Sequence, residues 1–389
     1  MIDRHIAKLR HCELGLGLRM GLSGGASFNP AILFANGEQG AWFDPSDLST
    51  LFQDSAGTTA GAVGQAVGLQ LDKSKGLAVG AELLGTGTTG LVGSATAAAY
   101  NTSTGAGSVT RVDGANQSFV SFASLTAINF YKVRIVNTGA VDLLVRAANS
   151  GGALVQTIVA GATFDGYISG QTTYVLTTAS GGGTASFTVT SFKHIAGNHA
   201  FQSTAASRPI LRQSAGGLLY LEYDGVDDFL VTNAIDFSAS DKVAVFAGVR
   251  ALANERIVLE LSPSLDTNNG SFYVYKSSSG WGFGSKGTVA SEPNATTYVP
   301  PITNVLTGLG DIGGDSAILR VNGSQSATSA TDQGTGNFGN YALYRGRRGG
   351  ASLSFNGWDF GTIIRGGAST DVLITQTEAW LANKTGVSF

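Results

Sequence analysis

The chain has one cysteine and few charged residues. Cys12 is the single cysteine among 389 residues, which excludes an internal disulfide and fits assembly in a reducing cytosol. Charged residues make up 13% of the chain, and the formal net charge is -3. Because binding to phosphates requires a clustered excess of Lys and Arg, this composition gives no reason to expect a nucleic-acid partner.

Long hydrophobic runs are also missing. No stretch approaches the length that a membrane-spanning helix needs, so membrane insertion is not expected. Residues 1–10 are basic, but the apolar positions after them, Leu14, Leu16 and Leu18, are interrupted by glycine and by Arg19. This pattern does not favour a signal peptide, and we expect any release from a cell to follow another route.

The residues that are abundant favour many short strands. Glycine accounts for 55 residues and apolar residues for 43% of the chain, enough to form substantial cores between turns. Residues 187–192 alternate apolar and polar side chains, as a strand with one buried face does. Residues 371–384 carry apolar side chains at helical spacing, and Gly386 follows them as a stop. We therefore predict an all-β protein of two domains with a short C-terminal helix.

Several motifs resemble the concanavalin-A-like (laminin-G-like) domains that are common in bacteriophage virion proteins. The resemblance is carried by Trp42-Phe43-Asp44-Pro45, Asp72-Lys73-Ser74, Gly197-Asn198-His199-Ala200, Arg208-Pro209, Asp224-Gly225-Val226-Asp227-Asp228 and Glu378-Ala379-Trp380-Leu381. In such domains the second motif runs directly into the third. Here a long segment separates them, and we interpret residues 76–195 as a second domain inserted into a surface loop of the first.

The inserted segment is similar to the galactose-binding-like jelly rolls of carbohydrate-binding modules. It lacks the Trp that such modules often place after the first strand, where Thr89-Gly90-Leu91 stands, so inherited sugar binding is not implied for it. Together the resemblances imply three parts: an extended N-terminal arm over residues 1–36, a concanavalin-like jelly-roll sandwich over residues 37–75 plus 196–389, and a galactose-binding-like β-sandwich over residues 76–195.

Motifs for catalysis are poorly supported. A glycosidase on a concanavalin-like fold needs two carboxylates that face each other across a cleft. Glu255 and Glu260 are an odd number of residues apart, so on one strand they would point to opposite faces. His194 and His199 share a face of neither a helix nor a strand, and packing is expected for them. We predict that the chain is not an enzyme.

One acidic cluster is a candidate metal site. Asp224, Asp227 and Asp228 supply the hard oxygen ligands that Ca²⁺ prefers, and some concanavalin-like domains bind this ion. Aspartates also build turns, because their side chains accept hydrogen bonds from the nearby backbone. A calcium site and a turn are both open interpretations, and no other cofactor is predicted.

Aromatic residues give the best indication of binding, because sugars stack their apolar faces on exposed rings. Trp281 lies in the small-residue segment 278–284, which we predict to be a loop, and Tyr298 lies nearby in the sequence. Arg345 begins a basic cluster that is either a solvated loop or a glycan contact. Tyr273 and Tyr275 are two residues apart and share one face of a strand. Burial in the sandwich core is the favoured interpretation for them and for Trp281, and contact with a sugar is the other.

The leading hypothesis is a structural component of a bacteriophage virion, such as a fibre, tail or capsid-attached protein. Residues 1–36 would dock to other virion proteins, and the sandwiches would serve assembly and host-surface adhesion after assembly in the host cytoplasm. A homotrimer is the expected oligomer, since such proteins form symmetric assemblies. The alternative is an adhesin that recognises a host-surface glycan. A polysaccharide-degrading enzyme is the least favoured hypothesis.

Overall fold

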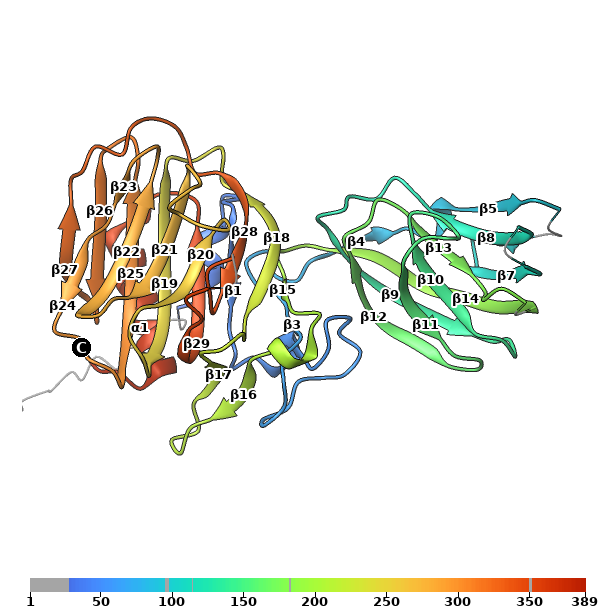
Figure 1. Ribbon diagram of the computed structural model, residues 1–389, viewed down its shortest axis with the longest axis horizontal. Coiled ribbons are helices and arrows are strands. Elements are labelled where there is room, and N and C mark those ends of the chain that lie inside the picture. Colours follow the sequence, from blue (N-terminus) through green and yellow to red (C-terminus); the bar gives the residue numbers. More distant parts are fainter. Residues whose placement is uncertain (1–27, 95–97, 114, 182, 350–351) are drawn as a thin grey trace, which may run out of the picture.

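The computed structural model describes residues 28–94, 98–113, 115–181, 183–349 and 352–389. These residues form two β-sandwiches that lie end to end along the long axis of the molecule (Figure 1). The described part contains one α-helix, α1 (Asp371–Thr385), close to the C-terminus. The predicted all-β fold with a short C-terminal helix is confirmed. Most of the predicted N-terminal arm, together with Cys12, lies outside the described residues.

The larger sandwich is built from two antiparallel sheets. Sheet A has the order β16-β17-β29-β19-β25-β26-β27, with β1 paired to β29, and its strands are β1 (Gly40–Phe43), β16 (Ile210–Gln213), β17 (Leu219–Asp224), β19 (Lys242–Ala251), β25 (Ile302–Asp311), β26 (Ser316–Val321), β27 (Ser324–Ser329) and β29 (Asn356–Arg365). Sheet B has the order β2-β3-β15-β18-β28-β20-β21-β22-β23, with β24 paired to β22. Its strands are β2 (Leu51–Phe52), β3 (Leu69–Gln70), β15 (Ala200–Phe201), β18 (Leu230–Asp236), β20 (Arg256–Leu261), β21 (Ser271–Lys276), β22 (Gly280–Lys286), β23 (Ala290–Ser291), β24 (Asn294–Thr296) and β28 (Asn340–Arg345).

The second sandwich is built from one continuous stretch of the chain. Its strands, collectively sheet C, are β4 (Val79–Glu82), β5 (Gly87–Val92), β6 (Ala99–Tyr100), β7 (Ala106–Arg111), β8 (Gln117–Phe122), β9 (Phe130–Asn137), β10 (Leu143–Ala147), β11 (Leu154–Ile158), β12 (Thr163–Ser169), β13 (Tyr174–Thr177) and β14 (Gly183–Ile195). Apolar side chains from these strands close on a separate core that includes Phe122, Phe187 and Phe192. Short 3₁₀ helices complete the described part: η1 (Pro30–Phe34), η2 (Leu48–Thr50), η3 (Leu84–Thr86) and η4 (Ala205–Ser207).

The chain leaves the larger sandwich after β3 and returns to it at β15, and these two strands pair with each other. Asp72 holds this seam together. Its carboxylate accepts hydrogen bonds from the backbone N–H groups of Trp42 and Asn198, each at 2.7 Å, and from Ser74. Two motifs that are far apart in the sequence therefore lie side by side. Burial raises the pKa of Asp72, and the N–H donors that surround it stabilise the carboxylate form.

An apolar joint fills the space between the two sandwiches. The larger sandwich contributes Leu69 and Leu71, and sheet C contributes Phe130, Tyr167 and Ile195. All of these side chains are at most 8% exposed. Two covalent connections and a buried apolar contact thus fix the direction in which the second sandwich extends.

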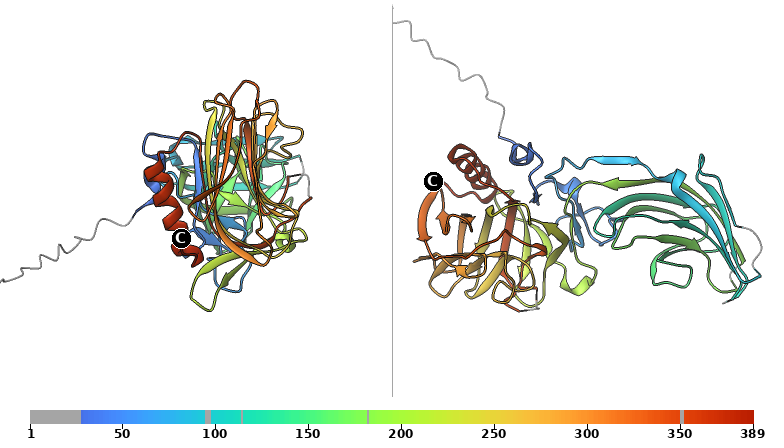
Figure 2. Two further views of the ribbon diagram at one scale, coloured as in Figure 1. Left: turned by 90° about the vertical axis from the view of Figure 1, so that its left-hand side faces the viewer. Right: turned by 90° about the horizontal axis from the view of Figure 1, so that it is seen from above.

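Helix α1 packs against the outer face of sheet A (Figure 2). Residues from three of the motifs named above, those around Trp42, Lys73 and Trp380, meet at this contact. Asp44 lies 3.1 Å from the Lys384 ammonium and 3.5 Å from that of Lys73, and the rings of Trp42 and Trp380 meet edge to face at 5.9 Å. These motif residues hold α1 against sheet A through an ion pair and an aromatic contact, and so contribute to the stability of the fold.

Candidate functional site

The outer face of sheet B carries two tyrosines that lie next to each other. Strand β21 alternates, so Phe272 and Val274 enter the core of the larger sandwich while Tyr273 and Tyr275 point away from it. The two tyrosine rings meet edge to face, with centroids 4.7 Å apart. The prediction that the two tyrosines share one face is confirmed, but this face is the outer one: Tyr273 is buried at 6% exposure in a small separate cluster with Ile257 and Leu265, and Tyr275 packs against that cluster rather than in the sandwich core.

Glycines on the neighbouring strand make room for these rings. Gly284 lies directly opposite Tyr273 in the register, and Gly282 lies directly opposite Tyr275. A Cβ atom at Gly282 would stand 2.0 Å from the Tyr275 ring, and one at Gly284 would stand 2.9 Å from the Tyr273 ring. Only glycine lets the two rings lie across the strand, so β22 supplies the floor of the site.

The same alternation buries Trp281. The segment predicted to be a loop is strand β22, whose Trp281 and Phe283 point into the core while its glycines face outward. Trp281 is 0% exposed, and its indole N–H donates to Asn304 Oδ1 at 2.8 Å. The interpretation of Trp281 as a core residue is confirmed, and a ring enclosed in this way has no free face for a sugar, so the expectation that Trp281 presents its ring to a ligand is not supported.

A β-bulge brings Glu255 and Glu260 to the same face. The register of β20 shifts between Ile257 and Leu259, and the two successive residues Val258 and Leu259 both enter the core. The extra inward residue restores Glu260 to the outer face, next to the ring cluster of Ile257 and Tyr273. The prediction of opposite faces is corrected, because it assumed an unbroken strand.

Arg348 forms ion pairs with two carboxylates of this region, those of Glu260 and Asp266. Its Nε donates to Glu260 Oε2 at 3.0 Å, and its Nη1 pairs with the carboxylate of Asp266. Glu260 is fully buried, and its other oxygen accepts from the backbone N–H of Leu265. Burial raises the pKa of Glu260 to about 7, although the adjacent guanidinium opposes this shift. Both oxygens of Glu260 are thus hydrogen-bonded to groups of the protein itself.

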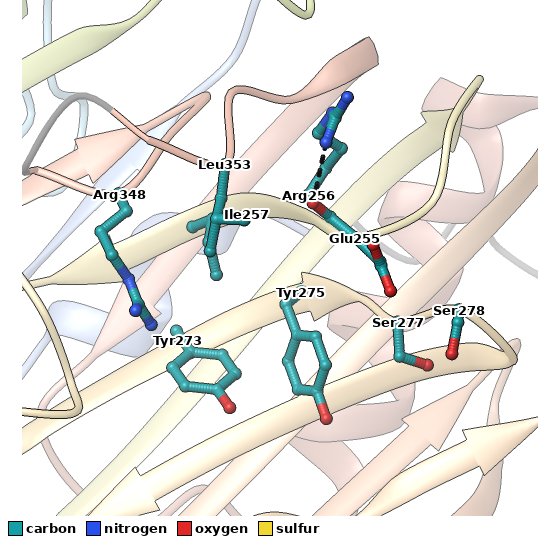
Figure 3. A pocket seen from close by; sticks show the side chains of 9 residues that line it. All are labelled: Glu255, Arg256, Ile257, Tyr273, Tyr275, Ser277, Ser278, Arg348 and Leu353. Carbon is teal, nitrogen blue, oxygen red and sulfur yellow. Dashed lines mark hydrogen bonds between the residues drawn. The ribbon is translucent and has the colours of Figure 1, made fainter.

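These side chains enclose an open pocket of about 300 Å³ (Figure 3). We call it the tyrosine pocket, and it is lined by Glu255, Arg256, Ile257, Tyr273, Tyr275, Ser277, Ser278, Arg348 and Leu353. The Tyr273 hydroxyl donates to Glu292 at 2.5 Å, and the Tyr275 hydroxyl accepts from Asn294 at 3.1 Å. Both rings are thereby held in place. The pocket combines apolar ring surface with hydroxyl and carboxylate groups.

The other two candidate ligand residues lie apart from this pocket. Arg345 is 1% exposed inside the larger sandwich, where it pairs with Asp359 at 2.5 Å and stacks over the ring of Phe43. An arginine committed in this way inside the core does not meet a ligand, which corrects the expectation of a glycan contact. Tyr298 is half-buried and packs against the core, outside the lining of the pocket.

The structure brings the three predicted calcium ligands together. One oxygen each of Asp224, Asp227 and Asp228 lies within 4.8 Å of the others. Asp224 accepts from the backbone N–H of Val226 at 2.8 Å, Asp227 accepts from Ser207 at 2.5 Å, and Asp228 accepts from the N–H of Asp224 at 3.1 Å. Burial, helped by the charge of Asp224, raises the pKa of Asp228 to about 7. The contacts are those of a turn, and calcium binding stays a prediction.

The two histidines have separate surroundings. His199 is 1% exposed, and its Nδ1 accepts from the backbone N–H of Asp72 at 2.9 Å. Its ring meets that of Phe130 edge to face at 5.0 Å, and burial lowers its pKa to about 3. His194 is half-buried beside Tyr131. Both histidines pack at the seam between the sandwiches.

Within the part of the chain that the structure describes, no helix combines the length and the apolar character that a membrane span requires.

Comparison with known proteins gives partial structural likenesses. No known family and no curated protein matches the chain. The IT-sialidase CBM40 of Ruminococcus gnavus is 16% identical, covering 36% of this chain and 84% of its own, with a TM-score of 0.30. Domain 4 of AbnA, a GH43 extracellular arabinanase from Geobacillus stearothermophilus solved with arabinotriose, is 13% identical. The match covers 43% of this chain and 79% of that domain, with a TM-score of 0.34. The binding domain of botulinum neurotoxin DC, solved with SialylT, is 12% identical. The match covers 46% of this chain and 48% of that chain, with a TM-score of 0.33.

Proposed function

We propose that the protein binds carbohydrate without cleaving it, and that the tyrosine pocket is its sugar site. The observation that carries this proposal is the pair of tyrosine rings laid across Gly282 and Gly284. Sugars bind proteins through an apolar C–H face that stacks on an aromatic ring and through hydroxyl groups that hydrogen-bond at its edges. The pocket supplies both kinds of group on one rigid sheet.

The polar groups at the rim suit hydroxyl recognition. Ser277 and Ser278 line one side of the pocket in the turn between β21 and β22. Glu255 is exposed on the same side as these serines in Figure 3, and its carboxylate is an acceptor for two neighbouring hydroxyl groups. A pyranose ring over Tyr275 would meet these groups along its edge.

A glycan array probed with the full chain tests the proposal. Wild type is expected to bind a defined set of saccharides, and Tyr275→Ala to lose affinity by about tenfold or more, since an aromatic contact contributes on the order of 1.5 kcal/mol. Tyr298→Ala is the matched control, because it removes a half-buried tyrosine from the same sandwich outside the pocket. Absence of binding to every saccharide, or equal losses in both variants, would refute the proposal.

The wider setting that we propose for this site is the surface of a bacteriophage particle, as a glycan-binding adhesin. The support for this setting is the sequence resemblance of the motifs around Trp42, Lys73 and Trp380. Docking through residues 1–36, trimer formation and assembly in the host cytoplasm stay predictions. Binding of the full chain to purified phage particles, measured with and without residues 1–36, tests the docking prediction.

A further inference from the structure

The charged groups around the tyrosine pocket differ in how deeply they are buried. Glu255, Asp266 and Glu292 are exposed. The ammonium groups of Lys276 and Lys286 lie beneath the surface, in side chains that are 0% and 8% exposed. Lys276 donates to two backbone carbonyls, and Lys286 donates to the carbonyls of Leu265 and Asp266. Of these three carboxylates, that of Glu255 lines the pocket itself.

The two arginines that line the pocket, Arg348 and Arg256, differ in their partners. Arg348 has a side chain only 15% exposed, and it is held between the carboxylates of Glu260 and Asp266. Arg256 donates to the backbone carbonyl of Glu255 at 3.1 Å, and its guanidinium points away from the tyrosines in Figure 3. Proteins usually recognise a carboxylate through a free, two-pronged guanidinium, and the guanidinium that lies beside the tyrosines in Figure 3, that of Arg348, is already paired.

An acidic sugar over Tyr275 would consequently bring a further carboxylate close to that of Glu255. This approach is repulsive, and Arg348 cannot turn to the new carboxylate without leaving the buried carboxylate of Glu260 unpaired. A neutral sugar has no such cost, because its hydroxyl groups donate hydrogen bonds to the exposed carboxylates.

On the basis of the proposed sugar site, we infer that its ligand is a neutral saccharide and that carboxylated sugars, such as sialic acids and uronic acids, are rejected. The discrimination is assigned to the engagement of Arg348 by Glu260 and Asp266, together with the exposed carboxylate of Glu255.

Matched pairs of saccharides test this inference on the wild-type full chain. Each neutral oligosaccharide that binds on the array is compared, by isothermal titration calorimetry, with its counterpart that carries one carboxylate, such as lactose with 3′-sialyllactose or a galactan with a polygalacturonate. We expect the neutral member to bind about tenfold more tightly or better, the ratio that a 1.4 kcal/mol difference produces. Tighter binding of the carboxylated members overturns the inference while leaving the sugar site in place. Binding of neither class contradicts the proposed function itself.

One substitution tests the assigned cause. Asp266→Asn removes an exposed partner of Arg348 and frees part of its guanidinium, so the preference for the neutral member is expected to fall by about threefold or more. Asp142→Asn is the matched control, because it makes the same charge change at an exposed aspartate of the second sandwich. Circular dichroism checks that both variants stay folded. An unchanged preference in Asp266→Asn, or an equal change in Asp142→Asn, would overturn the role given to Arg348.

Discussion

Replacement of the glycine beneath Tyr275 is expected to weaken ligand binding without touching the ligand. In Gly282→Ala the new Cβ atom would stand 2.0 Å from the Tyr275 ring, well inside an ordinary contact of about 3.4 Å. The ring must therefore move outward by about 1.4 Å, which exceeds the tolerance of about 0.5 Å that a preorganised site allows. We expect the affinity for the best saccharide from the array to fall by about tenfold.

A graded series separates this effect from a general loss of stability. A Cβ atom at Gly284 would stand 2.9 Å from the Tyr273 ring, a milder overlap. At Gly216, in the turn before β17, a Cβ atom would meet only Ser214 Oγ, at 3.8 Å. The expected order of affinity loss is thus Gly282→Ala, then Gly284→Ala, then Gly216→Ala, which should bind like wild type. Affinity is measured by titration calorimetry, and melting temperature is recorded for each variant.

Two results would refute this reasoning. If Gly282→Ala binds as wild type does while Tyr275→Ala loses affinity, the ring is not positioned by the glycine beneath it. If all three alanine variants weaken binding equally, the losses reflect a general disturbance of the larger sandwich.

The sequence allowed the strands and the C-terminal helix to be predicted, because alternation and capping are local properties. Gly386 illustrates this point: it follows α1 with a φ of 73°, a conformation that glycine adopts without strain. The position of Trp281 could not be read in the same way. The residues around it look like a loop, because small residues dominate the segment, and only the pairing with β21 shows that its glycines lie beneath tyrosine rings.

Two features of the site depended on long-range structure. The bulge at Val258 placed Glu260 on the outer face, and strand alternation alone could not reveal an extra residue. Arg345 belongs to a basic cluster in the sequence, but its partner Asp359 comes from a strand of the opposite sheet. One local pattern could have indicated the site, namely the alternating glycines Gly282 and Gly284 of β22, which lie opposite the alternating tyrosines of β21.

Three further predictions concern stability. Asp359→Asn leaves the buried guanidinium of Arg345 without its anion and should lower the free energy of unfolding by about 3–5 kcal/mol in urea denaturation, whereas Glu222→Gln at an exposed pair should cost under about 1 kcal/mol. Burial lowers the pKa of His199 to about 3 from an ordinary value of 6.5. Its contribution to the free energy of unfolding is therefore complete above pH 6.5, and that free energy falls by about 1.4 kcal/mol per pH unit as the pH drops toward 3. His199→Asn should flatten the dependence of stability on pH in that range, and an unchanged slope would contradict the assignment. Because burial raises the pKa of Asp228 to about 7, its ionisation opposes folding as the pH rises from about 4 to 7, and Asp228→Asn should raise the melting temperature at pH 8 more than at pH 4. A calcium-dependent rise of the wild-type melting temperature that Asp228→Asn abolishes would instead favour the calcium interpretation.

The most direct test of the sugar site is a crystal structure of the protein with the neutral saccharide that binds best on the array. We expect a pyranose ring against the free face of Tyr275, with its hydroxyl groups in hydrogen-bonding contact with Glu255 and with Ser277 or Ser278. A saccharide bound at any other surface, with the tyrosine pocket empty in the same crystal, would contradict the account.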